Sequence, residues 1–486
     1  MKNRSSSDNS KRKFSKVKII CTLGPASQSV QSLTRLIRAE MNVARINFSH
    51  GTYSEHRMII KNLREASRVT GESIAILQDL QGPKIRVGEF IGESVKLLPG
   101  KPLTITTEKF KGTESRVSTT YQHLHTDVKR GDRILLDDGK LELRVENIKR
   151  HDVNCIVVTG GFLSSHKGIN LPGVAVSAPS LTGKDKEDLL FGLDNEVDYV
   201  ALSFVRRAKD IVMLREFIGR QRPGSRMIPI ISKVEKPEAI DDIDAIIEAS
   251  DAIMIARGDL GVEMPAEEVP ILQKMIVRKC NEQGKPVIIA TQMLESMVEN
   301  SKPTRAEASD VANAVLDGAD AVMLSEETSV GKYPSQAVDM MKKIIVNTED
   351  NAPQKFRFGN DRALSTHPYD PLAHAACMLA DYGKADAIVT LTHSGATASH
   401  IAKFRPPCSI IAVTDHVKII RRLNLVWGVR CLLVDNLHED SDTVLKMIRK
   451  ELLKKDYLKP GDTIVMVAGI PIFKRGASNT ISLDKV

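Results

Sequence analysis

The fold is decided by two stretches of sequence, Pro229-Ile230-Ile231-Ser232-Lys233-Val234-Glu235 and Ile253-Met254-Ile255-Ala256-Arg257-Gly258-Asp259. Each is a short apolar run that ends abruptly in charged side chains. Continuous apolar runs of this length indicate strands buried on both faces of a parallel sheet. Lys233 and Glu235 are two residues apart, so on a strand both side chains point to the same face. In a parallel barrel the carboxyl ends of the strands line the active site, and we expect these charges there.

The same pattern of apolar strand and amphipathic helix recurs along the chain. We predict eight strands, at residues 17–22, 42–48, 74–79, 198–204, 228–235, 251–257, 286–291 and 320–325. Helical patterns lie between most of them, such as 30–40, 54–69, 184–194, 207–220, 236–249, 266–283 and 304–317. Alternation of this kind predicts a parallel sheet with helical crossovers. Eight units close a (β/α)8 TIM barrel, and we predict an α/β fold of that class.

The alternation breaks once, between the third and fourth strands. Residues 84–180 contain short runs of Val, Ile and Leu separated by turn signals such as Pro99-Gly100 and Asp138-Gly139. This predicts a small antiparallel β-barrel inserted over the barrel mouth, where a lid belongs. From residue 351 a polar linker leads into strands and helices of a third, open α/β domain. The predicted domains are a disordered basic tail (1–16), the barrel (17–83 and 181–350), the lid (84–180) and the C-terminal domain (351–486).

The net charge of +8 resembles a nucleic-acid signal, but it is concentrated at the N-terminus. Residues 1–18 hold seven basic side chains and Asp8, a net of +6, which leaves +2 for all the rest. Such a polar, aromatic-poor tail is typical of disorder. It lacks the apolar core of a signal peptide, and no run approaches the roughly 18 apolar residues of a membrane span. We expect a cytoplasmic protein with no nucleic-acid or membrane partner, and its six scattered cysteines indicate free thiols.

Polar residues gather at the ends of the first predicted strands. Arg45, Asn47 and Ser49 alternate onto one face, with His50 next to them, and they suit a pocket for phosphate and a cation. The alternative is a polar strand end that faces solvent. Asp79 ends another strand just before a Gly-Pro turn, where a lone Asp is more often a cap than a ligand.

The later strand ends carry a second group. Glu235 and Asp259 lie on adjacent predicted strands and could hold a hard cation such as Mg²⁺, which takes oxygen ligands and substrate phosphates. Lys233 would then face an oxyanion, and the amides that follow Gly258 could bind another anion. The alternative is an ion pair between Lys233 and Glu235 at the rim. Thr291 ends the next strand and could relay a proton, although a Thr there is usually a cap.

A separate signal lies in the third domain. The segment Thr390-Leu391-Thr392-His393-Ser394-Gly395-Ala396-Thr397 follows a predicted strand and precedes a helix. Hydroxyls, Gly and a helix N-terminus together make an anion nest. It is not a P-loop, because no Gly-Lys-Thr/Ser ending is present. We predict a phosphorylated effector here, with an ordinary capped helix as the alternative.

In this order, five motifs resemble pyruvate kinase: KIICTLGPAS (18–27), MNVARINFSHG (41–51), IISKVE (230–235), ARGDLGVEMP (256–265) and VIIATQMLESM (287–297). The resemblance extends from about residue 17 to the end of the chain. It implies a TIM-barrel A domain, a mobile B-domain lid and a C-terminal domain for regulation and assembly, usually in a homotetramer. It also implies transfer of a phosphoryl group from phosphoenolpyruvate to ADP, giving pyruvate and ATP in the last step of glycolysis.

The resemblance implies roles for individual residues. Substrate and catalysis would involve Arg45 on the phosphoryl group, Lys233 on the developing charge, the amides of Gly258 and Asp259 on the carboxylate, and Thr291 near the carbon that is protonated. Glu235 and Asp259 would hold Mg²⁺ or Mn²⁺. The nucleotide-side positions would be Asn47, His50, Arg86 and Lys167, and the effector would contact Thr392, Ser394, Gly395, Ala396 and Thr397. These roles agree with phosphoryl transfer by positioning and electrostatic stabilisation.

The main departure concerns potassium. Many members read Asp-Thr-Lys-Gly-Pro-Glu-Ile-Arg-Thr where this chain reads Asp79-Leu80-Gln81-Gly82-Pro83-Lys84-Ile85-Arg86-Val87. The family holds its monovalent cation with groups that match Asn47, Ser49, Asp79 and the carbonyl of Leu80, and these remain. Lys84 replaces a Glu, however, and this variant resembles members that work without K⁺. A fixed ammonium can supply the same unit charge, so we predict activity without potassium.

Two rival functions fit part of the sequence. A metal-dependent aldolase or lyase that acts on pyruvate enolates would explain Glu235 and Asp259, but not the lid or the phosphate-directed arginines. A basic RNA-binding protein would explain the net charge, and its binding should survive deletion of residues 1–16. With only +2 beyond residue 18, we expect that deletion to abolish any such binding.

Overall fold

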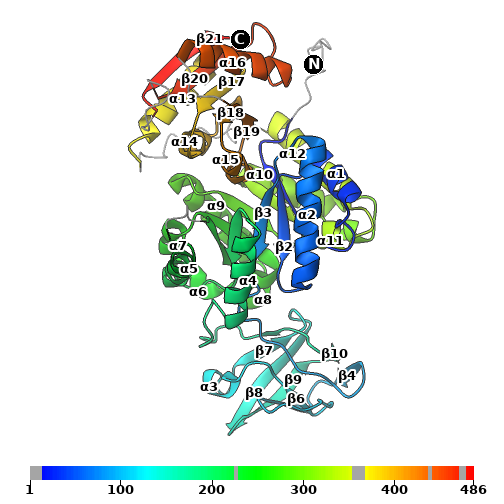
Figure 1. Cartoon of the computed structure of the whole chain (residues 1–486). Coiled ribbons are helices and arrows are strands. Elements are labelled where there is room, and N and C mark those ends of the chain that lie inside the picture. The colour runs from blue at the N-terminus through cyan, green and yellow to red at the C-terminus, as the bar shows by residue number, and fades with distance from the viewer. Residues whose placement is uncertain (1–13, 224–227, 353–366, 436–440, 470–477) are drawn as a thin grey trace, which may run out of the picture. The chain divides into compact units, whose positions relative to one another are not determined.

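The computed structural model describes residues 14–223, 228–352, 367–435, 441–469 and 478–486. Figure 1 shows the described strands as a barrel, a lid in cyan and a C-terminal sheet in yellow to red. Most of the predicted basic tail, up to residue 13, lies outside the described residues, and so does the predicted linker from 353 to 366.

The barrel is closed by eight strands in the order β1-β16-β15-β14-β13-β12-β3-β2. Their bounds are β1 (Lys18–Thr22), β2 (Val43–Asn47), β3 (Ala75–Asp79), β12 (Tyr199–Leu202), β13 (Ile230–Val234), β14 (Ala252–Ala256), β15 (Val287–Ala290) and β16 (Ala321–Leu324). All eight predicted strands are confirmed. Neighbours pair in parallel, as in the register of Lys233 with Met254 across β13 and β14. Nearly every strand residue is buried, because a parallel barrel covers both faces of its sheet.

Helices follow the barrel strands. They are α1 (Val30–Arg38), α2 (Tyr53–Thr70), α4 (Gly183–Asp194), α5 (Ala208–Gln221), α6 (Pro237–Asp241), α7 (Ile243–Ala249), α8 (Arg257–Glu263), α9 (Val269–Gln283), η1 (Glu295–Val298), α10 (Arg305–Asp317), α11 (Glu326–Ser329) and α12 (Pro334–Asn351). Capping boxes at Thr182 and Thr304 begin α4 and α10. Left-handed glycines end α9 at Gly284 and α10 at Gly318.

Two predicted boundaries in this part of the chain are wrong. The helix expected over 236–249 is two helices that meet at Asp242, which lies outside helical geometry. The strand expected over 251–257 stops at Ala256, and Arg257 already begins α8. This short helix places Asp259 in its first turn, where the helix dipole favours a carboxylate.

The lid follows β3 and has its own hydrophobic core, which includes Leu103, Ile105 and Leu143. Its elements are β4 (Ser94–Leu97), β5 (Pro102–Thr106), β6 (Arg116–Ser118), α3 (Leu124–Asp127), β7 (Arg133–Leu136), β8 (Leu141–Lys149), β9 (Asp152–Thr159), β10 (Gly161–Ser164) and β11 (Ile169–Asn170). They form a six-stranded sheet, β11-β7-β8-β9-β5-β6, and the pair β10-β4. Most pairs are antiparallel as predicted, but β5 and β6 pair in parallel, so the larger sheet is mixed.

The C-terminal elements form an open α/β sheet in the order β19-β18-β17-β20-β21. They are α13 (Asp370–Tyr382), β17 (Ala387–Leu391), α14 (Ala396–Lys403), β18 (Ser409–Thr414), α15 (Val417–Leu423), β19 (Val429–Leu433), α16 (Ser441–Lys454), β20 (Thr463–Ala468) and β21 (Thr480–Lys485). The predicted open α/β domain of strands and helices is confirmed. The sequence reasoning missed β21, an antiparallel edge strand.

By its contacts the chain divides into two compact units. One comprises Met1–Ala44, Asn62–Ala75 and Met293–Val486, and the other comprises Arg45–Lys61 and Ile76–Gln292. The lid, the strand β13 with Lys233 and the helix α8 with Asp259 belong to the second unit. Among the described helices, none has the length and apolar character that a bilayer crossing needs.

Candidate active site

Lys233 occupies the fourth position of β13 and is held by three side chains. Its Nζ lies 2.8 Å from Glu235 Oε1 and 3.2 Å from Asp79 Oδ1, and it donates to Ser203 Oγ at 2.9 Å. The Lys233 side chain is 11% exposed, and both carboxylates are 1% exposed. The rim ion pair between Lys233 and Glu235 therefore exists, but it is buried and is one part of a larger charge cluster.

Arg45 extends this cluster from β2. Its Nε donates to Asp79 Oδ2 at 2.7 Å, while Lys233 approaches the other oxygen of the same carboxylate. Asp79 thus lies between two cations at the carboxyl end of β3. Arg45 itself is 9% exposed, so the solvent screens this ion pair little. Arg45, predicted to grip the phosphoryl group, and Lys233, predicted to stabilise the developing charge, therefore share one carboxylate.

The pKa values follow from this arrangement. Burial alone would lower the pKa of Lys233, but the charges of Asp79 and Glu235 outweigh it and raise that pKa above the ordinary lysine value. Burial alone would raise the pKa of Asp79, but the positive charges of Lys233 and Arg45 outweigh burial and lower that pKa below the ordinary aspartate value. Both groups are therefore charged at neutral pH. Lys233 therefore presents a permanent positive charge from β13.

Ser203 is a member of the cluster that the sequence reasoning missed. Its hydroxyl donates to the carbonyl of Leu80 at 2.6 Å and accepts from Lys233. It lies just after β12 and is buried. A polar residue at the end of the predicted strand 198–204 was the available signal. The Leu80 carbonyl, which the resemblance assigns to a monovalent cation, accepts this hydrogen bond.

Glu235 and Asp259 supply the oxygen atoms for a hard cation. Glu235 is buried, and its Oε2 accepts from the backbone N–H of Phe204 at 2.8 Å. Burial raises the pKa of Glu235, Lys233 opposes the change, and the neighbouring Asp259 carboxylate adds to it. A buried Glu235 carboxylate beside a second carboxylate forms a donor set that a divalent cation would satisfy. These residues therefore fit Mg²⁺ or Mn²⁺, which prefer one or two carboxylates plus substrate oxygens.

Thr291 lies beside the start of α8. The backbone N–H of Gly258 donates to Thr291 Oγ1 at 2.7 Å, and that hydroxyl donates to the carbonyl of Ala290 at 2.6 Å. Thr291 has φ +68° and Gln292 has φ +55°, a conformation that a β-branched residue rarely adopts. Strain of this kind persists only where the surroundings impose it, and it is concentrated at functional sites.

The remaining predicted residues lie outside the Lys233 cluster. Asn47 accepts the backbone N–H of Ser49 at 3.1 Å, and His50 is exposed. In the lid, Arg86 donates to the carbonyl of His166 at 2.8 Å, and Lys167 forms a 2.7 Å ion pair with Asp137. Asn47, Arg86 and Lys167 thus make these contacts within their own segments of the chain.

Lys84 lines a small cavity between the lid and the barrel together with Phe204, Lys236 and Asp259. Lys236 is held by a 2.6 Å ion pair with Glu263, so it is already neutralised. Lys84 makes no ion pair with any residue that the structure describes, and it is partly buried. Its charge thus lies in the same cavity as a predicted magnesium ligand.

The loop after β17 has the predicted nest geometry. Gly395 has φ +87°, and its N–H donates to Thr392 Oγ1 at 2.9 Å. The N–H of Ala396 donates to Ser394 Oγ at 3.3 Å, and the hydroxyl of Thr397 lies 2.9 Å from that of Ser478. These five positions are therefore close together at the start of α14. Part of their hydrogen-bonding capacity is used within the loop.

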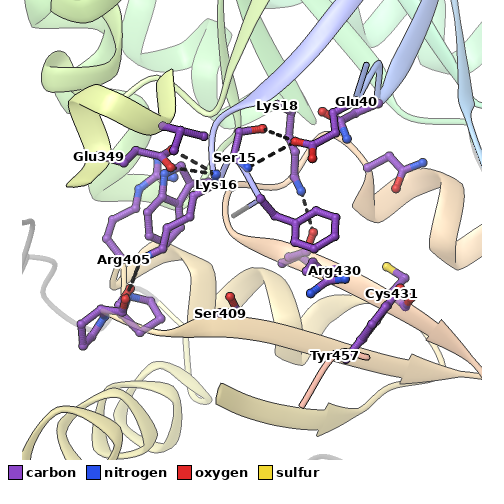
Figure 2. A pocket seen from close by; sticks show the side chains of 18 of the residues that line it. Ser15, Lys16, Lys18, Glu40, Glu349, Arg405, Ser409, Arg430, Cys431 and Tyr457 are labelled. Carbon is purple, nitrogen blue, oxygen red and sulfur yellow. Dashed lines mark hydrogen bonds between the residues drawn. The ribbon is translucent and has the colours of Figure 1, made fainter. Parts of the chain in front are cut away.

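A larger cavity, of about 1440 Å³, lies in the first unit (Figure 2). It contains no residue of the Lys233 cluster. Lys18, the first residue of β1, points across it and donates to the carbonyl of Val429 at 2.6 Å. Burial lowers the pKa of Lys18 to about 8. Glu349 accepts from the backbone N–H of Lys16 at 3.0 Å and from that of Val17 at 2.9 Å.

Comparisons with known proteins agree along the chain. A family model described as the barrel domain of pyruvate kinase matches residues 14–338, and one described as its alpha/beta domain matches residues 370–483. Pyruvate kinase 2 of Synechocystis sp. is 46% identical over 477 residues, covering 97% of this chain and 79% of the relative. The pyruvate kinase of Mycobacterium tuberculosis is 46% identical over 472 residues, covering 96% of this chain and 98% of the relative.

A solved structure agrees as well. The crystal structure of a pyruvate kinase from Cryptosporidium parvum superimposes with a TM-score of 0.91 at 36% sequence identity. It covers 97% of this chain and 96% of the solved chain. The likeness therefore includes the barrel, the lid and the C-terminal sheet.

Proposed function

The chain belongs to the pyruvate kinase family of phosphotransferases, and from this premise we propose that it transfers the phosphoryl group of phosphoenolpyruvate to ADP. The products would be pyruvate and ATP, in the last step of glycolysis. One observation carries the proposal: a buried, permanently charged Lys233 lies within 3.2 Å of Asp79 and Glu235, with Arg45 on the same Asp79 carboxylate. Phosphoryl transfer needs fixed cations of this kind, because catalysis is mostly positioning and charge stabilisation.

Lys233 and Arg45 act on the transferred group. Arg45 binds the phosphoryl oxygens of phosphoenolpyruvate, and Lys233 stabilises the charge that develops on the phosphoryl group and on the enolate oxygen. Ser203 is a positioning residue, because it accepts from Lys233 and is itself fixed by the Leu80 carbonyl. A preformed charge in a buried site needs no reorganisation during the reaction.

Glu235 and Asp259 hold the divalent cation. Bound Mg²⁺ or Mn²⁺ neutralises and orients the substrate oxygens. The amides of Gly258 and Asp259 bind the substrate carboxylate, since they lie in the first turn of α8. The Gly258 N–H donates to Thr291 Oγ1, so substrate binding by this amide requires a change in that contact. Thr291 lies against Gly258 and is the residue we assign to the region of the carbon that is protonated after transfer.

The nucleotide is bound from both sides of the mouth. We assign Asn47 and His50 on the barrel side, and Arg86 and Lys167 on the lid side, to ADP and ATP. Arg86 and Lys167 contact lid residues within the described chain, so their engagement with nucleotide requires a change in these contacts. Domain movement over the mouth is common in enzymes that must exclude water during transfer.

Potassium independence is the next part of the proposal. The monovalent-cation groups are Asn47, Ser49, Asp79 and the Leu80 carbonyl. Two of these already have partners, because Asp79 pairs with Arg45 and Lys233 and the Leu80 carbonyl accepts from Ser203. Lys84 lines the cavity that contains Asp259 and would supply the unit charge.

Regulation is assigned to the loop after β17. A sugar phosphate or a nucleotide would bind its phosphate at Thr392, Ser394, Gly395, Ala396 and Thr397, where amides and hydroxyls gather at the start of α14. Titration of sugar phosphates and AMP at low phosphoenolpyruvate tests this. An unchanged saturation curve with every compound would contradict it.

We also propose the domain boundaries, the cytoplasmic location and the homotetramer given above. The lid boundaries 84–180 and the C-terminal boundary near 351 are supported by separate hydrophobic cores in these segments. A cytoplasmic location is supported by six cysteines that are all free. A homotetramer rests on the family resemblance alone.

The decisive assay follows ATP formation from phosphoenolpyruvate and ADP with Mg²⁺ in a buffer free of potassium and sodium. We expect full activity there, and little stimulation by added K⁺. A strict requirement for K⁺ would overturn the monovalent-cation proposal but not the reaction. Absence of ATP formation together with cleavage of a hydroxy acid would favour the aldolase or lyase alternative instead.

A further inference from the structure

Three metal-ligand side chains meet at the C-terminal sheet, outside every role assigned above. They are His393, which follows β17, and Asp415 and His416, which follow β18. His393 Nδ1 lies 3.7 Å from Asp415 Oδ1, and His416 Nε2 lies 3.6 Å from the same oxygen. One ligand atom from each residue lies within 4.8 Å of the other two.

The backbone brings these residues together. β17 and β18 are adjacent parallel strands, and Leu391 pairs with Val413, so both chains leave the sheet at the same edge. The N–H of Thr392 then donates to the carbonyl of Val413 at 2.9 Å, which fixes the residue before His393. The N–H of His416 donates to Thr414 Oγ1 at 3.3 Å at the start of α15.

Asp415 is the most buried of the three side chains, whereas the two histidine rings are exposed and can rotate. Asp415 is 16% exposed, whereas His393 is 46% and His416 is 58% exposed. An exposed imidazole can rotate about its side-chain bonds without disturbing a packed core. The His393–Asp415 and His416–Asp415 spacings are within a few tenths of an ångström of the ~3.4 Å that separates tetrahedral ligands ~2.1 Å from one ion. Rotation of the two exposed rings has to bring the histidine nitrogens, which lie within 4.8 Å of each other, to the same spacing.

We propose that His393, Asp415 and His416 form a binding site for Zn²⁺ or a similar late first-row transition-metal ion. Imidazole nitrogen is a preferred ligand of these metals, while Mg²⁺ demands oxygen ligands. Three protein ligands leave a coordination position open to water or to an anionic ligand. The site differs in chemistry from Glu235 and Asp259, which offer oxygen alone.

A second His–Asp pair shows why the third ligand matters. His400 Nδ1 lies 2.9 Å from Asp370 Oδ1, but Lys403 Nζ donates to the other oxygen of that carboxylate at 2.8 Å. The lysine already supplies the positive charge there, and it excludes a metal ion by like-charge repulsion. At Asp415 both histidine rings approach Oδ1, and an imidazole binds metal when it is neutral.

Metal binding would have a local mechanical consequence. It would join the loop after β17 to the loop after β18 through one ion, at the edge where α14 and α15 begin. His393 lies between Thr392 and Ser394, so the ion would restrict the backbone of that loop. Metal binding at this site would be independent of any effector at the loop and of the reaction at the barrel.

The test measures Zn²⁺ bound to the untagged full-length protein by equilibrium dialysis, with excess Mg²⁺ present to occupy the carboxylate site. We expect one Zn²⁺ per chain that is lost in His393→Gln and in His416→Gln. Each change should weaken binding at least ~100-fold, since even outer-shell partners of a metal contribute 10–100-fold. His123→Gln, an exposed lid histidine outside the site, serves as the matched control and should bind as the unmodified protein does.

Cobalt provides a second readout that does not depend on stoichiometry. Co²⁺ that is bound by imidazole nitrogen at a low coordination number should give a visible absorption spectrum, and the two His variants should lack it. Unaltered far-UV circular dichroism would show that the variants fold. If the double variant His393→Gln/His416→Gln binds as much Zn²⁺ with the same affinity as the unmodified protein, the proposal is wrong.

Discussion

Two buried lysines at opposite ends of the barrel strands have opposite electrostatics. Lys233 is the fourth residue of β13, near the carboxyl end, and Asp79 and Glu235 raise its pKa. Lys18 is the first residue of β1, at the amino end, and burial lowers its pKa to about 8. Lys18 has no ion pair with a carboxylate among the described residues. It donates instead to the uncharged Val429 carbonyl, as Figure 2 shows.

The difference shows how one residue type is used in two ways in one barrel. At the carboxyl end, two carboxylates keep a lysine charged, and that charge is available to a substrate. At the amino end, the lysine connects β1 to β19 by a hydrogen bond and its charge is destabilised. In TIM barrels generally, the carboxyl ends of the strands carry the active site and the amino ends contribute to stability. The two lysines follow this division.

The strongest test of the comparison removes the carboxylate between the two cations. Asp79→Ala should destabilise the protein by ~3–5 kcal/mol, because Arg45 and Lys233 are left buried without their partner. Glu216→Ala, which removes the exposed partner of Arg220, is the matched control and should lower stability by no more than ~1 kcal/mol. Urea unfolding monitored by circular dichroism measures both. Equal losses of unfolding free energy in the two variants would mean that burial does not make the Asp79 ion pairs more important for stability than an exposed pair.

The second test exchanges each lysine for an apolar residue. Lys233→Met should lower kcat about 100- to 1000-fold, equivalent to the ~2.7–4 kcal/mol that one charge-stabilising donor contributes. Lys18→Met should leave kcat within about threefold of the unmodified enzyme, since Lys18 lies outside the charge cluster. A coupled assay for pyruvate measures both. A large fall in kcat for Lys18→Met alone would reverse our assignment of the two ends.

The third test uses pH. The pKa of Lys18 is about 8 in the folded protein and 10.5 in the unfolded chain. Between pH 8 and pH 10.5 the unfolded chain therefore binds more protons than the folded protein does. The free energy of unfolding should therefore gain a contribution of a few kcal/mol as pH rises from 8 to 10.5, at about 1.4 kcal/mol for each tenfold change in proton affinity. The same titration of Lys18→Met should lack that contribution. Identical pH profiles for the two proteins would contradict the lowered pKa.

The smallest expected effect concerns Lys84, whose charge lies in the cavity with Asp259. Lys84→Glu should lower kcat/KM in potassium-free buffer by about 5- to 30-fold, the ~1–2 kcal/mol expected of one partly solvated charge. Added K⁺ should restore much of this loss, because a Glu leaves room for a mobile cation. Lys84→Gln is the neutral control. A variant that loses activity and does not respond to K⁺ would argue against the replacement of potassium by Lys84.

The sequence was sufficient to predict the barrel because its strands are continuous apolar runs. Strands such as Ile230–Val234 and Ala252–Ala256 have no other stable location than a doubly covered sheet. Boundaries that depend on the tertiary structure were missed. Arg257 begins α8 because its neighbours pack against β15, and β21 has a polar composition typical of a solvent-exposed edge. The parallel pairing of β5 with β6 depends on a connection that no turn motif signals.

The site shows the same limit. Lys233, Glu235, Asp79 and Arg45 stand out because charged residues at the ends of apolar strands are costly to bury. Their shared hydrogen bonds could not be predicted, since they join residues 30 and 34 positions apart. Ser203 was missed for a related reason. A serine is small and uncharged, and nothing in the local sequence indicates that its hydroxyl joins Leu80 to Lys233.

The place of the lid in the chain has a consequence for how the protein folds. β3 and β12 pair directly, with Leu77 opposite Tyr199, although the whole lid lies between them in sequence. Joining such distant segments is slow, because the chain must first lose the entropy of a long open loop. The lid has its own core and can collapse early, which brings its two ends close together. We therefore expect early lid folding to shorten the search by which β3 finds β12, so that a module placed to cover the mouth also acts as a folding clamp for the barrel.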